Sequence, residues 1–387
     1  HYLAGVLYVV SGGSLYSVNS SGVETLIGAI GGAGPVRMAS NYTQLCIAAN
    51  GTGYVYSGGA LSTPLAFSVS DVLYADGYML WVVRNSEQFF ISALDDALTY
   101  DAADIASVEG FPDDIVGAVN DHREIVFAGG NSFEIFYNSG AAAFPFERQG
   151  NAFIERGCFD RDSIVKADGS VLFVGDDRIV YTLQGYQPVR ISTHAVEYRL
   201  RNATYARAMA YASEGHHFYC IEHDGGTEVY DRSTGAWHER QSYGATHWRV
   251  GGAIEAYGLQ LFSDRGNGKL YTPSLDVFTE NGTTLPFDIY LPTIESGRER
   301  ACMYAFEVVC DTGVGNGDVA DPQIMLRYSD DGGHLWSNEM WRSLGAIGVH
   351  RTRAVWRKLG QFRQRQLHLR ITDAARRLVI SYFVDAG

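Results

Sequence analysis

The strongest constraint on the fold is a loose repeat, about 35 to 45 residues long, that consists of short strands and fills the first two-thirds of the chain. Each unit holds two apolar, aromatic-rich runs around a turn, as in 7–10 and 15–18 around Ser11-Gly12-Gly13. The other paired runs lie at 45–49 and 54–56, 78–83 and 88–92, 124–127 and 133–137, 171–174 and 179–183, 217–221 and 228–231, and 258–262 and 269–272. Such repeats are typical of β-propeller blades, which bury their faces by packing in a ring. We therefore predict an all-β chain that begins with a β-propeller of six or seven blades; the alternative is an irregular set of β-sandwiches without a ring.

The composition agrees with a folded, mostly β chain. Gly accounts for 44 and Tyr for 24 of the 387 residues. Glycine allows tight turns, and tyrosine fits pleated surfaces. Apolar residues make up 46% and charged residues 19% of the chain, which argues against a disordered polymer.

The sequence pattern changes near 279–282 and predicts a second domain. Beyond this point apolar residues alternate with a period of two, which is typical of a sheet with one buried and one solvated face. The residues expected to face inward are Phe306, Val308, Cys310, Ile324, Leu326, Tyr328, Leu367, Leu369 and Ile371, whereas His368, Arg370 and Thr372 are expected to face outward. We predict a β-propeller domain over 1–280 and a C-terminal β-sandwich domain over 281–387.

Charge is distributed unevenly between these two domains. Residues 281–387 contain 13 Lys/Arg and 12 Asp/Glu, a net charge of +1, so residues 1–280 carry 17 − 32 = −15. A free-standing, non-specific DNA-binding protein should be basic, because it neutralises phosphates. That class is therefore largely excluded. No run of 18 apolar residues occurs, so no membrane span is predicted.

Cysteine and histidine spacing predicts no cofactor and no metal site. The five cysteines (Cys46, Cys158, Cys220, Cys302 and Cys310) are irregularly spaced and contain no CxxC pair. His217 and His223 share a strand parity but lie roughly 20 Å apart on an extended strand, too far for one ion. The chain begins at His1 without a Met, and we expect a natural N-terminal segment to be missing.

The sharpest local motif is an Asp-box turn formed by Ser329, Asp331, Gly333 and Trp336. In such a turn the aspartate caps N–H groups and the tryptophan packs beneath. Sialidases carry these boxes, so a sialidase-like glycoside hydrolase is an alternative function. That chemistry needs converging arginines and an acid/base carboxylate. The box occurs once and outside the propeller repeats, so we interpret it as a fold-stabilising turn and predict no catalytic residues.

Arginines in the last domain form a possible partner-contact basic strip. Arg351 and Arg353 are two residues apart, as are Arg363 and Arg365, so each pair should share one face of a strand. Such a strip could meet an acidic partner or a DNA backbone. The alternative is a solvated outer face.

Several stretches together resemble one known family. They are 133–140 (FEIFYNSG), 144–148 (FPFER), 190–194 (RISTH), 215–219 (GHHFY), 234–240 (TGAWHER), 329–336 (SDDGGHLW) and 356–360 (WRKLG). This combination, which spans nearly the whole chain, is similar to the packaged-DNA stabilisation proteins of short-tailed bacteriophages, also called tail hub or nozzle proteins.

The resemblance implies a structural role in the virion tail. It implies a hexameric ring below the portal and adaptor rings, through which double-stranded DNA passes and which a tail needle or fibre plugs. It implies assembly in the host cytoplasm, help in retaining the packaged genome, and no catalytic residues. We expect the acidic propeller to form or flank the conduit and the sandwich to make protein contacts. A carbohydrate-binding host-receptor module, with exposed Trp and Tyr in one groove, is a further alternative.

Overall fold

The computed structural model describes residues 1–32, 34–108, 110, 112–295, 297 and 299–387. Within these residues the regular secondary structure is almost entirely β, with one short helix, α1 (His194–Leu200), and one 3-10 turn, η1 (Arg161–Ser163). No helix in this part of the chain is long and apolar enough to cross a membrane. The chain divides into two compact units, one of 1–241 with 245–272 and one of 242–244 with 273–387.

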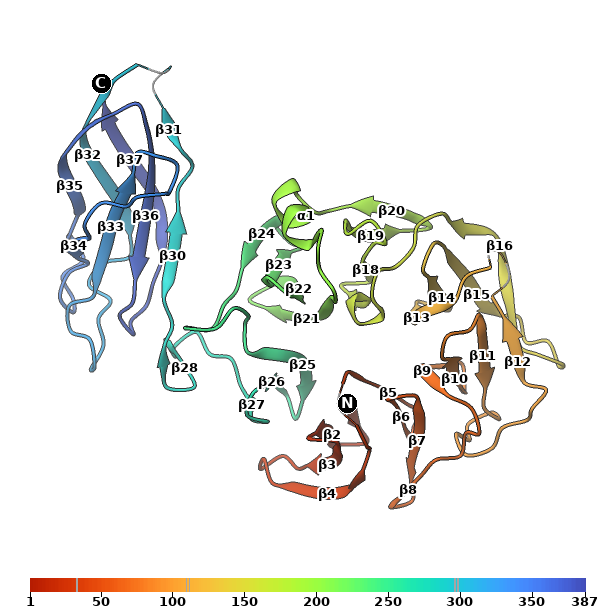
Figure 1. Cartoon of the computed structure of the whole chain (residues 1–387). Coiled ribbons are helices and arrows are strands. Elements are labelled where there is room, and N and C mark those ends of the chain that lie inside the picture. Colours follow the sequence, from red (N-terminus) through yellow and green to blue (C-terminus); the bar gives the residue numbers. More distant parts are fainter. Residues whose placement is uncertain (33, 109, 111, 296, 298) are drawn as a thin grey trace. The chain divides into compact units, whose positions relative to one another are not determined.

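The first unit is a seven-bladed β-propeller in the described part of the chain, and Figure 1 shows its blades arranged in a ring. Blades 1 to 3 are β1 (Tyr2–Leu3), β2 (Val6–Ser11), β3 (Ser14–Val18) and β4 (Glu24–Ala29); β5 (Val36–Ser40), β6 (Leu45–Ala49), β7 (Thr52–Ser57) and β8 (Ala60–Ser62); and β9 (Val69–Ala75), β10 (Tyr78–Val83), β11 (Gln88–Ile91) and β12 (Ile105–Ser107). The prediction of a propeller is confirmed. Six of the predicted hairpins are the central hairpins of the four-stranded blades, and the seventh is the second hairpin of the three-stranded last blade.

Blades 4 to 6 also have four strands, whereas the last blade has three. They are β13 (Ile115–Asp121), β14 (Glu124–Gly129), β15 (Phe133–Asn138) and β16 (Phe146–Ile154); β17 (Val165–Ala167), β18 (Ser170–Val174), β19 (Val180–Gln184) and β20 (Gln187–Arg190); β21 (Arg207–Ser213), β22 (His216–His223), β23 (Gly226–Asp231) and β24 (Ala236–Glu239); and β25 (Val250–Ala256), β26 (Leu259–Asp264) and β27 (Leu270–Tyr271). All strand pairs within the blades are antiparallel.

A recurring two-residue turn explains why the first hairpin of five blades closes tightly. The dipeptides Ala4-Gly5, Asp76-Gly77, Asp168-Gly169, Glu214-Gly215 and Tyr257-Gly258 have positive φ at both residues. Two positive φ angles define the type I′ turn, whose twist matches that of paired strands. Glycine at the second position therefore favours the hairpin in each of these blades.

The buried apolar side chains of the propeller fall into seven clusters in the described residues, one at each junction between neighbouring blades. At the junction of blades 3 and 4, for example, the rings of Phe89 and Phe127 stack with centroids 4.5 Å apart. The junction of blades 7 and 1 contains Leu7, Val18 and Ala256. Here the Tyr257 hydroxyl accepts a hydrogen bond from the Leu7 N–H (3.0 Å) and donates to the Val18 carbonyl (2.5 Å). Side-chain packing thus closes the ring.

A short segment around η1 joins several blades that are distant in sequence. Asp160 accepts hydrogen bonds from the N–H groups of Asp162 (2.9 Å) and Ala206 (3.0 Å), the latter at the start of blade 6. Asp162 pairs with Arg37 of blade 2 at 3.2 Å, and the Arg161 guanidinium donates to the Ser70 carbonyl of blade 3. We call residues 160–163 the η1 clamp, because these contacts hold blades 2, 3 and 6 to one segment.

The second unit is a β-sandwich, which confirms the predicted fold. One sheet contains β30 (Phe287–Tyr290), β36 (Gln364–Ile371), β33 (Gln323–Ser329) and β34 (Met340–Ser343), with β31 (Ile294–Glu295) also on β36; the other contains β35 (Ala354–Phe362), β32 (Ala301–Cys310) and β37 (Val379–Ala386). A separate hairpin is formed by β28 (Thr279–Glu280) and β29 (Thr283–Thr284). The residues predicted to face inward all belong to, or pack against, one core cluster between the sheets.

The outward face of this sheet differs from the prediction at one position. His368 was expected on a solvated surface, but it is fully buried. The Tyr290 ring stacks on the His368 ring at 4.2 Å, and Trp336 lies edge-on to it at 5.7 Å. These two aromatic rings cover the histidine and exclude water.

Candidate interaction surfaces

The Asp-box turn follows directly from the end of β33. The Ser329 hydroxyl donates to Asp331 (2.7 Å) and accepts from the Gly333 N–H (2.9 Å). The Asp331 carboxylate also accepts from the Leu335 N–H at 2.9 Å. The hydrogen bonds from the Leu335 N–H and the Ser329 hydroxyl hold the pKa of Asp331 below its ordinary value, because they favour the ionised carboxylate. The turn orients Trp336 toward the face of the sheet.

Beneath Trp336 lies a polar network that crosses three strands. Arg327 on β33 donates from Nε to Nδ1 of His368 (2.7 Å), so Nδ1 carries no proton. The other ring nitrogen, Nε2, donates to Asp288 on β30 at 2.5 Å. Arg370 donates two hydrogen bonds to the same carboxylate, at 2.6 and 3.1 Å. Burial opposes ionisation of Asp288, but the bonds from His368 and Arg370 outweigh it and lower its pKa.

The predicted basic strip is wrong for Arg365. This side chain is only 1% exposed and forms a bidentate pair with Asp330 at 2.7 and 2.8 Å. Its guanidinium lies 4.0 Å from the centroid of the Tyr328 ring. The side chain therefore completes the base of the Asp-box turn. Strand alternation could place Arg365 on a face but could not identify Asp330, which lies 35 residues earlier, as its partner.

The remaining arginines of the strip lie at opposite ends of β35. Arg351 and Arg353 precede this strand and Arg363 follows it, and all three are exposed. Ten residues of extended chain span about 33 Å, so the arginines do not form one compact cluster. Arg353 is also paired with Glu307 through two hydrogen bonds, one of them 2.6 Å long. The predicted strip is therefore divided into two separate basic positions, one before β35 at Arg351 and Arg353 and one after it at Arg363.

The propeller brings two arginines together but leaves them engaged with protein groups. Arg37 and Arg161 both contact Asp162, at 3.2 and 3.0 Å. Arg37 also donates to the Arg161 carbonyl at 2.5 Å. A glycosidase would need arginines available to a substrate carboxylate, whereas these guanidinium groups bind the η1 clamp. Among the described residues, no three His, Cys, Asp or Glu side chains are arranged to hold a metal ion.

Two structural features had no clear signal in the sequence. The Arg327–His368–Asp288 network joins residues 41 and 80 positions apart, and the η1 clamp joins Arg37 to a segment 124 residues away. The period-two pattern assigned His368 to the face opposite Leu367 and Leu369, but it did not identify Arg327 as a partner. Their pairing depends on strand register, which periodicity does not determine.

The sequence matches two family models that together span nearly the whole chain. The model described as Bacteriophage P22 Gp10, beta-propeller, of the phage-stabilisation family, matches residues 2–277. The model described as Bacteriophage P22 Gp10, beta-sandwich, matches residues 286–387. No curated protein matches the chain.

Solved structures resemble the chain only distantly. The β-propeller domain of Cps50 (Swd1) from Myceliophteria thermophila is 10% identical, with 70% of this chain and 97% of that chain covered and a TM-score of 0.42. The WD40 propeller domain of Doa1 is 10% identical, covers 68% and 88%, and has a TM-score of 0.44. An exo-β-1,3-galactanase from Phanerochaete chrysosporium is 9% identical, with 100% of this chain and 96% of that chain covered and a TM-score of 0.33. These likenesses carry no argument about activity.

The family assignment therefore rests on the two models and on a propeller and a sandwich in the same order. It removes the glycoside-hydrolase alternative, because the family is structural. The chain belongs to the phage-stabilisation family of bacteriophage P22 Gp10: it is a packaged-DNA stabilisation protein of the phage tail, a structural component of the virion and not an enzyme.

Proposed function

We propose that copies of this chain assemble into a closed ring, a hexamer, that forms a conduit for double-stranded DNA in the tail. The ring helps to retain the packaged genome and joins the portal and adaptor rings to the distal tail needle or fibre. Assembly takes place in the host cytoplasm before the tail is completed. The main support is the match of both family domains along one chain, at 2–277 and 286–387.

The charge of the chain supports a conduit that DNA can slide through. Each copy carries −14, so six copies carry 6 × −14 = −84. Acidic surfaces repel phosphates, whereas a wall rich in Lys and Arg would bind them and slow passage. Salt screens this repulsion beyond roughly 8 to 10 Å. The repulsion therefore acts on DNA close to the wall, and we propose that the propeller, with −15, forms or flanks the wall.

Genome retention in particles tests this proposal. Particles filled with DNA but assembled without this chain should release DNA that a nuclease can digest. Adding the purified chain to filled particles that carry the adaptor ring should protect the DNA. Equal nuclease sensitivity with and without the chain would contradict the proposed role in retention.

A further inference from the structure

One face of the sandwich is exposed to solvent and combines apolar and basic side chains with two acids, Glu307, which pairs with Arg353, and Asp385. On the sheet β35-β32-β37, Glu307 of β32 is flanked by Val355 and Phe383. Because Trp356 points into the core, its neighbours Val355 and Arg357 point outward. Phe383 is 63% exposed. We call this outer surface, with Arg351 and Lys358 beside it, the basic sheet face.

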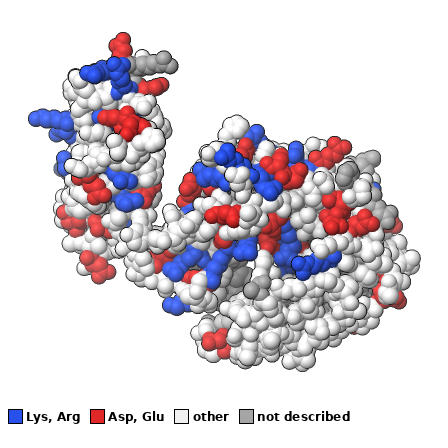
Figure 2. Space-filling view, in the orientation of Figure 1, with Lys and Arg blue, Asp and Glu red and all other residues white. Residues whose placement is uncertain are grey.

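The chain segment that supplies β35 is strongly basic, although it also includes β34 and β36 of the other sheet. Residues 340–372 contain eight Lys/Arg and no Asp/Glu, a net charge of 8 − 0 = +8. Arg353, Arg365 and Arg370 pair with acids of the same domain. Arg351, Arg357 and Lys358 are exposed cations that a partner could meet. Figure 2 shows basic side chains on the surface of the second unit.

The propeller has a complementary surface in blades 2 and 3. Residues 38–107 contain one Lys/Arg and seven Asp/Glu, so they carry 1 − 7 = −6 of the net charge of the propeller. The loop 92–104 of blade 3 packs beside the turn 41–44 of blade 2, because Gln44 donates to Asp96 at 3.1 Å. Tyr42 is 80% and Leu94 60% exposed in these two segments.

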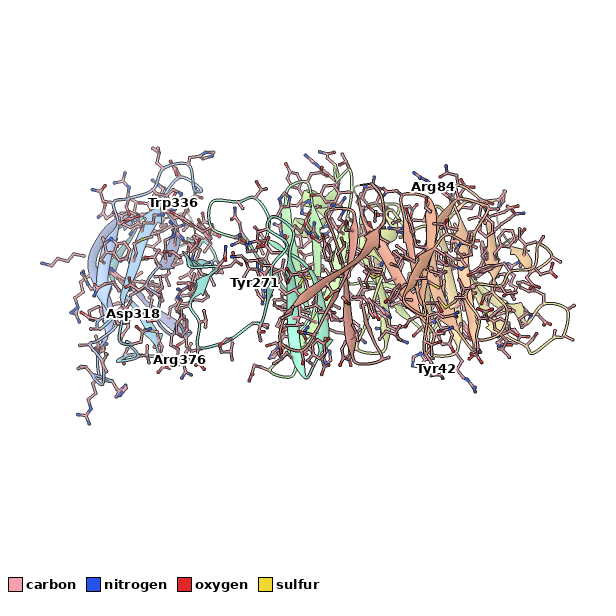
Figure 3. The ribbon with its side chains drawn as sticks, turned by 90° about the horizontal axis from the view of Figure 1, so that it is seen from below. Tyr42, Arg84, Tyr271, Asp318, Trp336 and Arg376 are labelled. Atoms are coloured by element: carbon pink, nitrogen blue, oxygen red, sulfur yellow. The ribbon has the colours of Figure 1, made fainter. Side chains whose placement is uncertain are left out.

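We call these two segments, together with the turn at Asp76, the acidic loop group. Asp76, Asp95 and Asp101 are exposed acids within it. Figure 3 shows Tyr42 on one face of the propeller and Arg84 on the opposite face. The group thus presents exposed apolar side chains among acids on one face of the propeller.

We propose that the basic sheet face of one copy docks on the acidic loop group of the next copy. Each surface combines exposed apolar side chains with charges opposite to those of the other. Pairing two basic faces, or two acidic groups, would place like charges opposite each other, which is unfavourable. Contact between two different surfaces is head-to-tail, and such contacts form a ring when the rotation between neighbouring copies closes. The inference rests on the proposed ring and names the contact that closes it.

Charge reversal on each surface tests the contact. One variant carries Arg351→Glu, Arg357→Glu and Lys358→Glu, and the other carries Asp76→Lys, Asp95→Lys and Asp101→Lys. Each variant alone should sediment as a single chain, or need at least tenfold more protein than wild type to assemble. An equimolar mixture should restore the ring with the variants alternating, because each reversed surface then meets its complement.

Two further variants separate docking from general charge and folding effects. Glu24→Lys, Glu214→Lys and Glu255→Lys together change the charge by the same amount at exposed positions outside the acidic loop group and should leave assembly unchanged. The second variant replaces the same three acids with asparagine (Asp76→Asn, Asp95→Asn and Asp101→Asn), a residue that tolerates the left-handed backbone at 76 and 95. It should weaken assembly less than the variant in which the three acids are replaced with lysine.

The outcomes distinguish this contact from the ring itself. Rings formed by both reversed variants alone, or a mixture that stays unassembled, would overturn the contact and leave the proposed ring standing. A wild-type chain that never forms a ring, with or without the adaptor, would overturn both. Restoration by mixing supports the contact.

Discussion

The propeller and the sandwich bury their apolar side chains in different ways. The propeller distributes them over seven clusters, one per junction, whereas the sandwich has one cluster between two sheets. A blade contributes to two junctions, so the effect of a core substitution there is shared with its neighbours around the ring. In the sandwich, both sheets pack on the same cluster. A core substitution there should therefore affect the whole unit, whereas one in the propeller should act mainly at its own junction.

Removal of a core side chain from the sandwich should have the largest effect. Trp356 is fully buried in the single core and donates from its indole N–H to the Met340 carbonyl at 2.9 Å. Trp356→Ala should lower the unfolding free energy of the sandwich by about 3 to 5 kcal/mol. Scanning calorimetry of the whole chain should show a lower transition for the sandwich and an unchanged one for the propeller. Equal shifts of both transitions would contradict independent cores.

Opening the η1 clamp should destabilise the propeller by a smaller amount. Asp160→Ala leaves the N–H groups of Asp162 and Ala206 without their acceptor, which costs about 1 to 3 kcal/mol. Only the propeller transition should fall in calorimetry. Asp114→Ala, at an exposed position, is the matched control and should change stability by less than about 0.5 kcal/mol. An Asp160→Ala chain as stable as that control would argue against the clamp.

Ring closure between blades 7 and 1 should depend in part on one hydroxyl group. Tyr257→Phe removes the hydrogen bonds to Leu7 and Val18 and should cost about 1 kcal/mol. Hydrogen exchange should speed up first at the Leu7 amide and in β2. Tyr16→Phe, in β3 of blade 1 beside β2, serves as the control. Unchanged exchange at Leu7 would mean that apolar packing alone closes the ring.

Mild acid should have the smallest effect. The comparison is between a partly exposed carboxylate of the sandwich, Asp288, and a buried carboxylate of the propeller, Glu228. Asp288 of the sandwich is bound by His368 and Arg370; Glu228 of the propeller lies near His223 and pairs with Arg199. Burial opposes ionisation in both, yet their partners hold each pKa below its ordinary value. A lowered folded-state pKa stabilises the fold above the unfolded pKa, and this stability is lost as pH falls through the folded value.

Both unfolding transitions should therefore change little between pH 7 and about 5 and fall below about pH 4. Asp288→Asn should make the sandwich transition less dependent on pH in this acidic range while the propeller keeps its dependence. Melting curves across the pH range measure this difference. A sandwich that gains stability as the pH falls would contradict the assigned direction.

The sequence predicted more of the propeller than of the candidate surfaces. Hairpins such as 124–127 with 133–137 are local, so turn residues and alternation identify them. Blade number stayed open because the units diverge and the last blade has three strands. Arg365 and His368 were misplaced because their burial depends on Asp330, Tyr290 and Trp336, which tertiary packing brings to them. Alternation assigns a face and does not reveal what covers it.

The mass of the wild-type assembly, with and without the adaptor ring, tests the central claim of a closed ring most directly. One chain has a mass of 42.5 kDa. We predict a discrete species at six times that mass, measured by sedimentation or native mass spectrometry, that joins the adaptor ring as a unit. A single 42.5 kDa chain at every concentration, unchanged by the adaptor, would contradict the account.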